Sequence, residues 1–236
     1  VEPGDGVRAS CLRTECGLVV SASEDGTAKV WDARTEALRA TFAGHSDWAG
    51  EDWVESASFS PNGASVVTVN RETATVWDAR TGALRATFEG HTDIVSSASF
   101  SEDGTSVVTA SADGTAKVWD ARTGMLRATL GAYQYLVESA SFSADGATVV
   151  TTSPNDQTAN VWDARTGTLR ATLGEDRDYV NSASLSPDGA LVVTTGVLTG
   201  KVWDARTGAL RATLEGHSLG VNSAGLRAGG ELVVTG

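Results

Sequence analysis

The amino-acid sequence predicts an all-β fold, a β-propeller in which four-stranded antiparallel blades repeat around an axis. The first observation is a segment, Val118-Trp119-Asp120-Ala121-Arg122-Thr123-Gly124, that recurs almost unchanged along the chain. The second is its spacing, because a period of about 40–45 residues is typical of one propeller blade. Successive tryptophans of the segment are separated by 46, 42, 43 and 41 residues and stand at Trp31, Trp77, Trp119, Trp162 and Trp203.

Residues 92–130 form the clearest repeat, and they divide into four short strand patterns. The first pattern alternates small or apolar residues with polar ones, as a half-buried strand does. The second is a short apolar run, typical of a strand buried on both faces. Gly104 and Gly124 supply the positive φ that the tight turns between strands require. The expected strands of this repeat are 95–101, 107–110, 116–119 and 125–130.

The same pattern extends over the chain as one repeat domain with five full blades and a partial sixth. The sixth unit contains only its first two strands, and an unpaired strand edge of this kind is a route to self-association. Three arrangements account for it: a truncated piece of a longer array, which we favour, an open propeller completed by a partner or second copy, and a five-bladed ring with a loose hairpin. The expected blades are about 7–42, 53–88, 94–130, 136–173 and 179–214, with the partial blade at 221–236.

The composition of the 236 residues restricts the class of partner. A formal net charge of −12 opposes binding to nucleic-acid phosphates. No apolar run approaches the ~20 residues of a membrane span, and the start of the chain lacks the pattern of a signal peptide. The two cysteines, Cys11 and Cys16, favour reduced thiols and an intracellular, cytoplasmic location. We therefore expect neither a nucleic-acid nor a membrane partner.

Catalysis has little support in the sequence. The three histidines, His45, His91 and His217, each follow a glycine at the same place in the repeat. They are spread over separate repeats without acids or thiols at ligand spacing, so no metal site is predicted. No serine stands in a nucleophile-elbow sequence, and no phosphate-binding glycine loop is present. We expect no cofactor and no enzymatic activity.

These repeats resemble the WD-repeat family of β-propellers over nearly the whole chain. The resemblance rests on five Trp-Asp pairs at this period and on Gly-His pairs between the last strand of one blade and the first of the next. The family uses a buried hydrogen-bonded set of His, Ser or Thr, Asp and Trp. The resemblance assigns this set to His91, Thr109, Asp113 and Trp119 in the third blade, whereas Tyr133 replaces the histidine in the fourth.

The resemblance implies a non-catalytic platform that assembles proteins or peptides. Naming the strands of a blade a to d in chain order, we expect the partner on the face that carries the d–a segments, which join one blade to the next. One alternative is a sensor or regulatory segment of a longer multidomain signalling protein, with that protein's own effector domain as the partner. The other is an enzyme, because fold alone does not exclude catalysis.

Aromatic residues outside the repeat positions all fall in the d–a segments. Tyrosine and tryptophan are enriched at binding hot spots, so these residues mark the expected docking surface. Trp48 and Tyr135 are the expected anchors, whereas for Trp53 and Tyr179 we favour the alternative of strand packing. Tyr133 has the alternative of filling the histidine position. The candidate partner-binding residues are Trp48, Tyr135, Trp53, Tyr133 and Tyr179, with Arg71 and Arg177 for acidic groups.

Ten of the 15 arginines also follow the repeat, five in the turns between strands c and d and five on strand d. They form a basic ring that suits an acidic partner. The alternative, which we favour, is local pairing with the aspartate of each Trp-Asp pair, at ~0–1 kcal/mol for each exposed pair.

Overall fold

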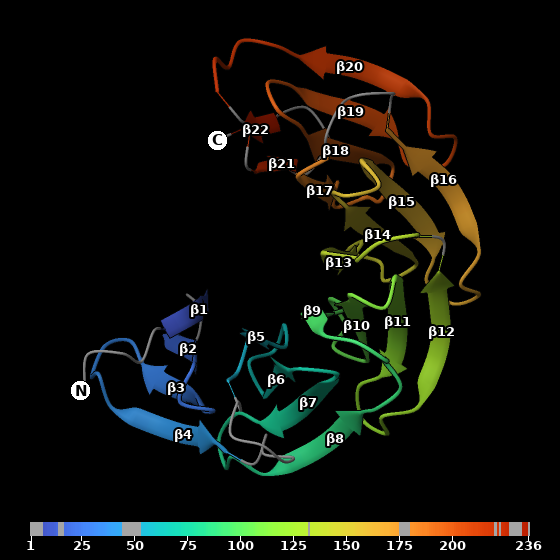
Figure 1. Cartoon of the computed structure of the whole chain (residues 1–236). Coiled ribbons are helices and arrows are strands. Elements are labelled where there is room, and N and C mark those ends of the chain that lie inside the picture. Colours follow the sequence, from blue (N-terminus) through green and yellow to red (C-terminus); the bar gives the residue numbers. More distant parts are fainter. Residues whose placement is uncertain are drawn as a thin grey trace.

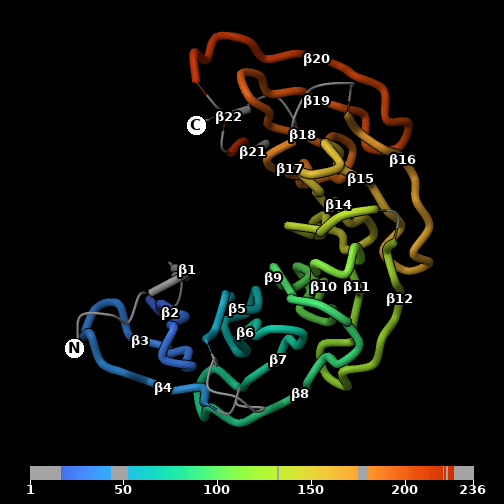
Figure 2. Tube along the Cα trace, in the orientation of Figure 1, coloured from blue at the N-terminus to red at the C-terminus, as the bar shows by residue number. Residues whose placement is uncertain are grey.

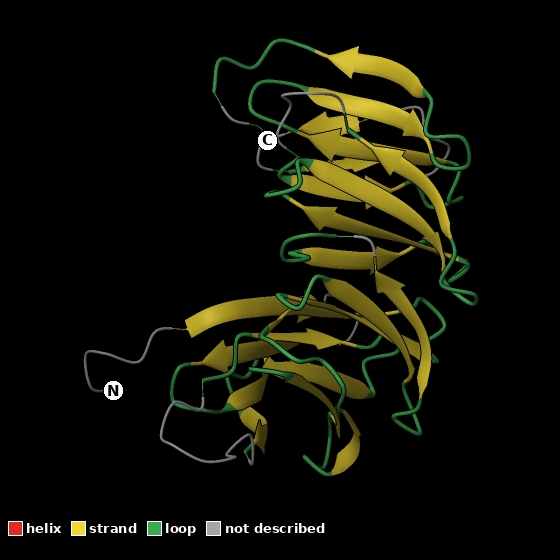
Figure 3. Ribbon diagram, turned by 45° about the vertical axis from the view of Figure 1, so that its right-hand side comes forward, coloured by secondary structure: helices red, strands yellow, loops and turns green. Residues whose placement is uncertain are grey.

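The structure is a computed structural model that describes residues 7–13, 17–43, 53–131, 133–174, 180–219, 221, 223–226 and 233–235. These residues form strands, turns and loops arranged as five four-stranded antiparallel sheets and one two-stranded sheet (Figure 3). The prediction of an all-β propeller with a partial last blade is therefore confirmed. None of the described residues lies in a helix long and apolar enough to cross a membrane.

Each full blade is a meander whose four strands are hydrogen-bonded in chain order. The a strands are β1 (Val7–Arg13), β5 (Ser56–Phe59), β9 (Val95–Phe100), β13 (Ser139–Phe142) and β17 (Ser182–Leu185). The b strands are β2 (Leu18–Ser23), β6 (Ser65–Asn70), β10 (Ser106–Ser111), β14 (Thr148–Ser153) and β18 (Leu191–Thr195). The c strands are β3 (Ala28–Asp32), β7 (Thr73–Asp78), β11 (Thr115–Asp120), β15 (Thr158–Asp163) and β19 (Gly200–Asp204). The d strands are β4 (Leu38–Phe42), β8 (Leu84–Phe88), β12 (Leu126–Gly131), β16 (Leu169–Leu173) and β20 (Leu210–Leu214), and the partial blade has β21 (Ala224–Leu226) and β22 (Val233–Thr235).

The blades stand side by side in an open arc (Figure 1). Strands a line the inner edge of the arc, where consecutive a strands contact one another, and strands d form its outer edge (Figure 2). Because strands alternate in direction, the a–b and c–d turns share one face, which we call the c–d face. The b–c turns and the d–a segments share the opposite face, the d–a face.

The hydrophobic core lies between blades rather than within each one. In the third junction, Val118 and Leu130 of one blade pack in a single cluster with Trp162 and Ala164 of the next. The other three described junctions between full blades repeat this arrangement. Burying one large aromatic side chain removes about 150–250 Å² from water, so each blade is stabilised chiefly by its neighbours.

The c–d turn fits closely against the preceding blade. Gly124 in this turn has a φ of 73°, and a Cβ there would lie 2.8 Å from the backbone oxygen of Thr87 in the preceding blade. Gly167 makes the same approach, with the corresponding Cβ 2.8 Å from the oxygen of Thr129. The backbone conformation therefore favours glycine at these two positions, and the lack of space for a Cβ excludes larger residues. The first blade has Glu36 at this position, with a φ of 58°.

Candidate interaction surfaces

Four side chains of the third blade form a continuous hydrogen-bonded set. Nδ1 of His91 lies 2.8 Å from Oδ2 of Asp113, and Nε2 lies 2.7 Å from Oγ1 of Thr109. The indole N–H of Trp119 donates to the same Oγ1 over 2.8 Å. Burial lowers the pKa of His91 and outweighs the opposing effect of the Asp113 carboxylate. A buried, fully partnered set of this kind stabilises the blade and offers no group to a ligand.

In every full blade the tryptophan indole donates a hydrogen bond to a Ser or Thr hydroxyl on strand b. The other hydrogen-bond partners of that hydroxyl differ between blades. In blade four the phenol oxygen of Tyr133 lies 2.8 Å from Oγ1 of Thr151 and donates to the Thr151 carbonyl over 3.0 Å. Burial raises the pKa of Tyr133. Tyr133 therefore occupies the histidine position and points into the blade, not toward the docking surface. The indole bonds outside blade three are Trp31–Ser21, Trp77–Thr68, Trp162–Thr151 and Trp203–Thr194.

On the d–a face, Tyr135 is 49% exposed, and its backbone N–H donates to Oδ2 of Asp156. Trp53 is half-buried and directly precedes the fully buried Val54. Arg71 is exposed in the b–c turn of blade two and has a φ of 46°, a conformation rare for residues other than glycine. Its carbonyl accepts a hydrogen bond from the N–H of Val95 in the next blade.

Four exposed apolar residues on the same face were missed by sequence reasoning. Each of them is at least about half exposed: Ile94, Val197, Leu198 and Leu219. Ile94 and Leu219 belong to d–a segments. Val197 and Leu198 occupy the b–c turn of blade five. The turn of blade five was recognisable in the sequence, because an apolar dipeptide stands where blade three has Asp113 and Gly114.

Three predicted site residues, Trp48, Tyr179 and Arg177, lie outside the described residues. Within the described ranges, no group of three or more His, Cys, Asp or Glu side chains is placed to hold a metal ion.

On the c–d face, the strand-d arginine of every full blade forms an ion pair with the aspartate that ends strand c. The expected local pairing is therefore confirmed for the five strand-d arginines, whereas within the described residues the five turn arginines form no such ion pair. In blade two, hydrogen bonds from Thr81 and the guanidinium of Arg85 hold the pKa of Asp78 below its usual range. The turn arginine Arg80 is exposed, and within the described part of the chain its side chain makes no ion pair. The pairs are Arg39–Asp32, Arg85–Asp78, Arg127–Asp120, Arg170–Asp163 and Arg211–Asp204.

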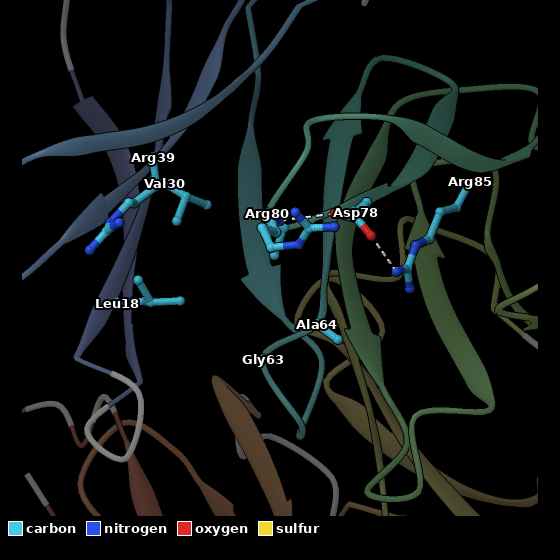
Figure 4. Close-up of a pocket in the computed structure, with 9 residues that line it drawn as sticks. Leu18, Val30, Arg39, Gly63, Ala64, Asp78, Arg80 and Arg85 are labelled. Carbon is cyan, nitrogen blue, oxygen red and sulfur yellow. Dashed lines mark hydrogen bonds and ion pairs between the residues drawn. The ribbon is translucent and has the colours of Figure 1, made fainter.

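Cavities open on the c–d face at the four junctions between consecutive full blades. In chain order they measure about 630, 630, 460 and 340 Å³. Each is lined by the strand-d arginine of one blade and by the c–d turn of the next, including its turn arginine. Figure 4 shows the first cavity, with Leu18 and Val30 of blade one across from Arg80 of blade two.

Comparisons with known proteins are consistent with this architecture. A family profile described as "WD domain, G-beta repeat" matches residues 3–32, 82–120 and 124–163, and each match ends at the aspartate of a Trp-Asp pair. The chain is similar to the crystal structure of the computationally designed protein Ika8, with 30% identity and a TM-score of 0.82 over 98% of this chain and 68% of that one. In all, 1715 solved chains match, so the fold by itself does not identify a partner. The search of curated proteins gave no match.

Proposed function

Because this chain belongs to the WD-repeat family, we propose that it is a non-catalytic scaffold that binds a protein or peptide partner on its d–a face. WD-repeat domains generally mediate protein–protein interaction and are typically non-enzymatic. The choice of face is supported by one observation: its exposed apolar side chains stand outside the repeated strand positions, whereas the exposed leucines beside the c–d turns recur at the start of strand d in every full blade. The exposed apolar side chains of the d–a face are Ile94, Tyr135, Val197, Leu198 and Leu219. Exposed apolar groups among polar surroundings are typical of interaction sites.

Tyr135 is the proposed anchor of this surface. Its phenol ring offers a large, stiff and amphipathic contact area at little cost in side-chain entropy. The bond from its backbone to Asp156 fixes the chain at that point. Arg71 lies in a b–c turn on the same face and adds a positive charge for acidic groups of the partner. An interface of ordinary size would bury about 1,200–2,000 Å², enough to extend over several blades.

The test is selection of peptides from a displayed random library on the immobilised full chain, followed by calorimetric titration of the selected peptides. We expect Tyr135→Ala to weaken their binding by about tenfold or more, as truncation of an aromatic hot spot does. Met125→Ala is the matched control, because Met125 is also exposed but belongs to the c–d turn of blade three. Selected peptides that bind Tyr135→Ala as tightly as the wild type, or that lose as much affinity with Met125→Ala, would contradict the proposal.

A second proposal is self-association through the last blades. On β20, Ala212 is exposed and Leu214 is half-buried, whereas the equivalent Ala171 and Leu173 on β16 are buried under the next blade. A second copy that covers this surface would remove apolar area from water. We expect light scattering to give a mass above the 24.3 kDa of one chain, rising with concentration. A constant mass of one chain at every concentration would rule this out.

A further inference from the structure

We infer that the cavity between blades one and two is a separate binding site for an acidic peptide segment in which a carboxylate side chain stands next to an aliphatic one. The site lies on the c–d face, opposite the proposed docking surface. It depends on different residues, so either proposal can fail without the other.

The cavity combines an apolar wall with a basic one. Its volume of about 630 Å³ falls in the range of small-ligand sites. Leu18 and Val30 form the wall contributed by blade one, and Ala64 and Ala79 add apolar surface from blade two. Arg39, Arg80 and Arg85 also line the cavity, and among the described lining residues Asp78 is the one acid (Figure 4).

Leu18 is the first of two residues that distinguish this cavity from the other three. In the next three blades, strand b begins with a hydroxyl residue that accepts a hydrogen bond from Nη1 of the strand-d arginine. Leu18 takes this place in blade one and accepts no bond, so within the described chain Arg39 retains only its pair with Asp32. The side chain of Arg39 is 55% exposed, compared with 42% for Arg85. The hydroxyl partners elsewhere are Arg85–Ser65, Arg127–Ser106 and Arg170–Thr148.

Asn62 is the second distinguishing residue, and it lies in the a–b turn of blade two, beside the cavity. Its Oδ1 accepts hydrogen bonds from the Ser60 hydroxyl and from the backbone N–H of Ala64. Asp103 makes the same two bonds in the turn of blade three, and hydrogen bonds from Ser101 and the Thr105 backbone lower its pKa, which keeps it charged. The turn thus needs an acceptor but not a charge. Blade two therefore lacks the negative charge that Asp145 and Asp188 supply at the same place in blades four and five.

These two differences affect the charge of the cavity. Asp78 is already paired with Arg85, and the guanidinium of Arg80 has no ion-pair partner among the described residues. The cavity between blades four and five has two arginines, Arg170 and Arg206, but three aspartates, Asp145, Asp188 and Asp204. A carboxylate is therefore attracted to the first cavity and opposed at the last.

The described lining of the second cavity is also basic, with Arg85, Arg122 and Arg127 beside Asp120. There, however, Ser65 accepts a bond from Arg85, and the adjoining turn carries the charged Asp103, so a carboxylate is favoured most at the first cavity. The apolar wall beside Arg39 favours a peptide with an aliphatic side chain over a small inorganic anion.

The test uses the full chain and a fluorescein-labelled hexapeptide, Gly-Leu-Glu-Leu-Glu-Gly, with its Gln-for-Glu analogue, whose side chains are neutral, as the control. In fluorescence anisotropy titrations we expect the acidic peptide to bind and the neutral analogue to bind at least about tenfold more weakly, because hydrogen bonds to charged groups are the strong ones. Arg80→Gln and Asn62→Asp should each weaken binding of the acidic peptide several-fold. Arg206→Gln, the equivalent change in the last cavity, should leave it unchanged.

Asn62→Asp is the informative variant if a cavity mutation disturbs folding, because aspartate is the native residue of that turn in blades three to five. Equal binding of both peptides would overturn the proposal. So would an absence of binding by the acidic peptide, or an equal loss of affinity with Arg206→Gln and Arg80→Gln. Tyr135→Ala should not change this affinity, which separates the result from the test of the d–a face.

Discussion

His91 and Asp113 form a buried pair in the third blade, with Nδ1 and Oδ2 2.8 Å apart and side chains only 1% and 6% exposed. A neutral imidazole satisfies every partner: Nδ1–H donates to Asp113, and Nε2 accepts from the hydroxyl of Thr109, whose oxygen accepts from the indole of Trp119. A protonated ring would bring a second donor to the Thr109 oxygen and turn its hydroxyl proton away. The pair is therefore built for the neutral form of His91.

The free energy of unfolding should fall as the pH is lowered below about 6.5. Burial holds the pKa of His91 below the 6.5 that is usual for histidine, so the unfolded chain binds more protons than the folded one just below that pH. The stabilising effect is complete above 6.5 and is lost as the pH falls toward the folded pKa. Urea midpoints of wild type and His91→Gln between pH 7.5 and 5 should converge at the acid end. A difference that stays constant with pH would exclude this account.

Tyr133→Phe should lower the free energy of unfolding by about 1 kcal/mol, because it removes the hydrogen bonds of a buried hydroxyl to Thr151. Tyr135→Phe is the matched control, since that side chain is half exposed and its phenol oxygen has no bond within the described structure. Urea denaturation of both variants measures the difference. Equal stability losses would show that Tyr133 does not act as the internal partner of Thr151.

Gly124→Ala should destabilise the chain more than Gly104→Ala, although both glycines have a φ near 70°. Alanine in that conformation costs about 1–2 kcal/mol at either site. At Gly104 a Cβ meets nothing within 4 Å, whereas at Gly124 it meets the Thr87 backbone at 2.8 Å. Relieving that overlap adds about 1–3 kcal/mol. Thermal unfolding of the two variants isolates the contact between blades, and identical midpoints would show that it contributes nothing.

Asp120→Ala should cost more stability than Arg127→Met, although the two side chains form one ion pair. Oδ1 of Asp120 also accepts the backbone N–H groups of Arg122 and Thr123, and these bonds hold the c–d turn. We expect about 1 kcal/mol for loss of the turn bonds and below about 0.5 kcal/mol for the solvent-screened ion pair. Chemical denaturation at low and high salt measures both variants. The ion-pair contribution, which both variants lose, should shrink at high salt, whereas the extra loss in Asp120→Ala should persist.

The fold was predictable because the same sequence pattern occurs five times. The regular spacing of Trp119 and its four equivalents therefore identified the blade period. The role of Tyr133 also follows from alignment, since it stands where blade three has His91. The surfaces were harder to predict, because exposure depends on which blade covers which. Val197 and Leu198 were visible in the sequence as a missing aspartate turn, but their exposure on the d–a face was not.

The contacts of the arginines were likewise predictable within a repeat but not between repeats. Strand pairing brings Arg127 beside Asp120 across the hairpin, so sequence periodicity was sufficient to predict that ion pair. Arg165, the turn arginine of the next blade, lines a cavity formed by two blades, and no single repeat contains that cavity. Leu18 and Asn62 matter for the same reason. Each is a small deviation within its own repeat, and only the junction between the repeats places Leu18 and the turn that contains Asn62 at one cavity.

The location of the hydrophobic core between blades also bears on how such arrays change over time. Every junction joins the same two kinds of surface, a face with the Trp-Asp-Ala segment and a face with valine and a large apolar residue of strand d. Duplicating or deleting one whole unit by recombination would therefore create a junction of the existing kind. Gain or loss of a whole unit therefore costs this architecture little stability, whereas an insertion of part of a unit would leave tryptophans without a complementary neighbour.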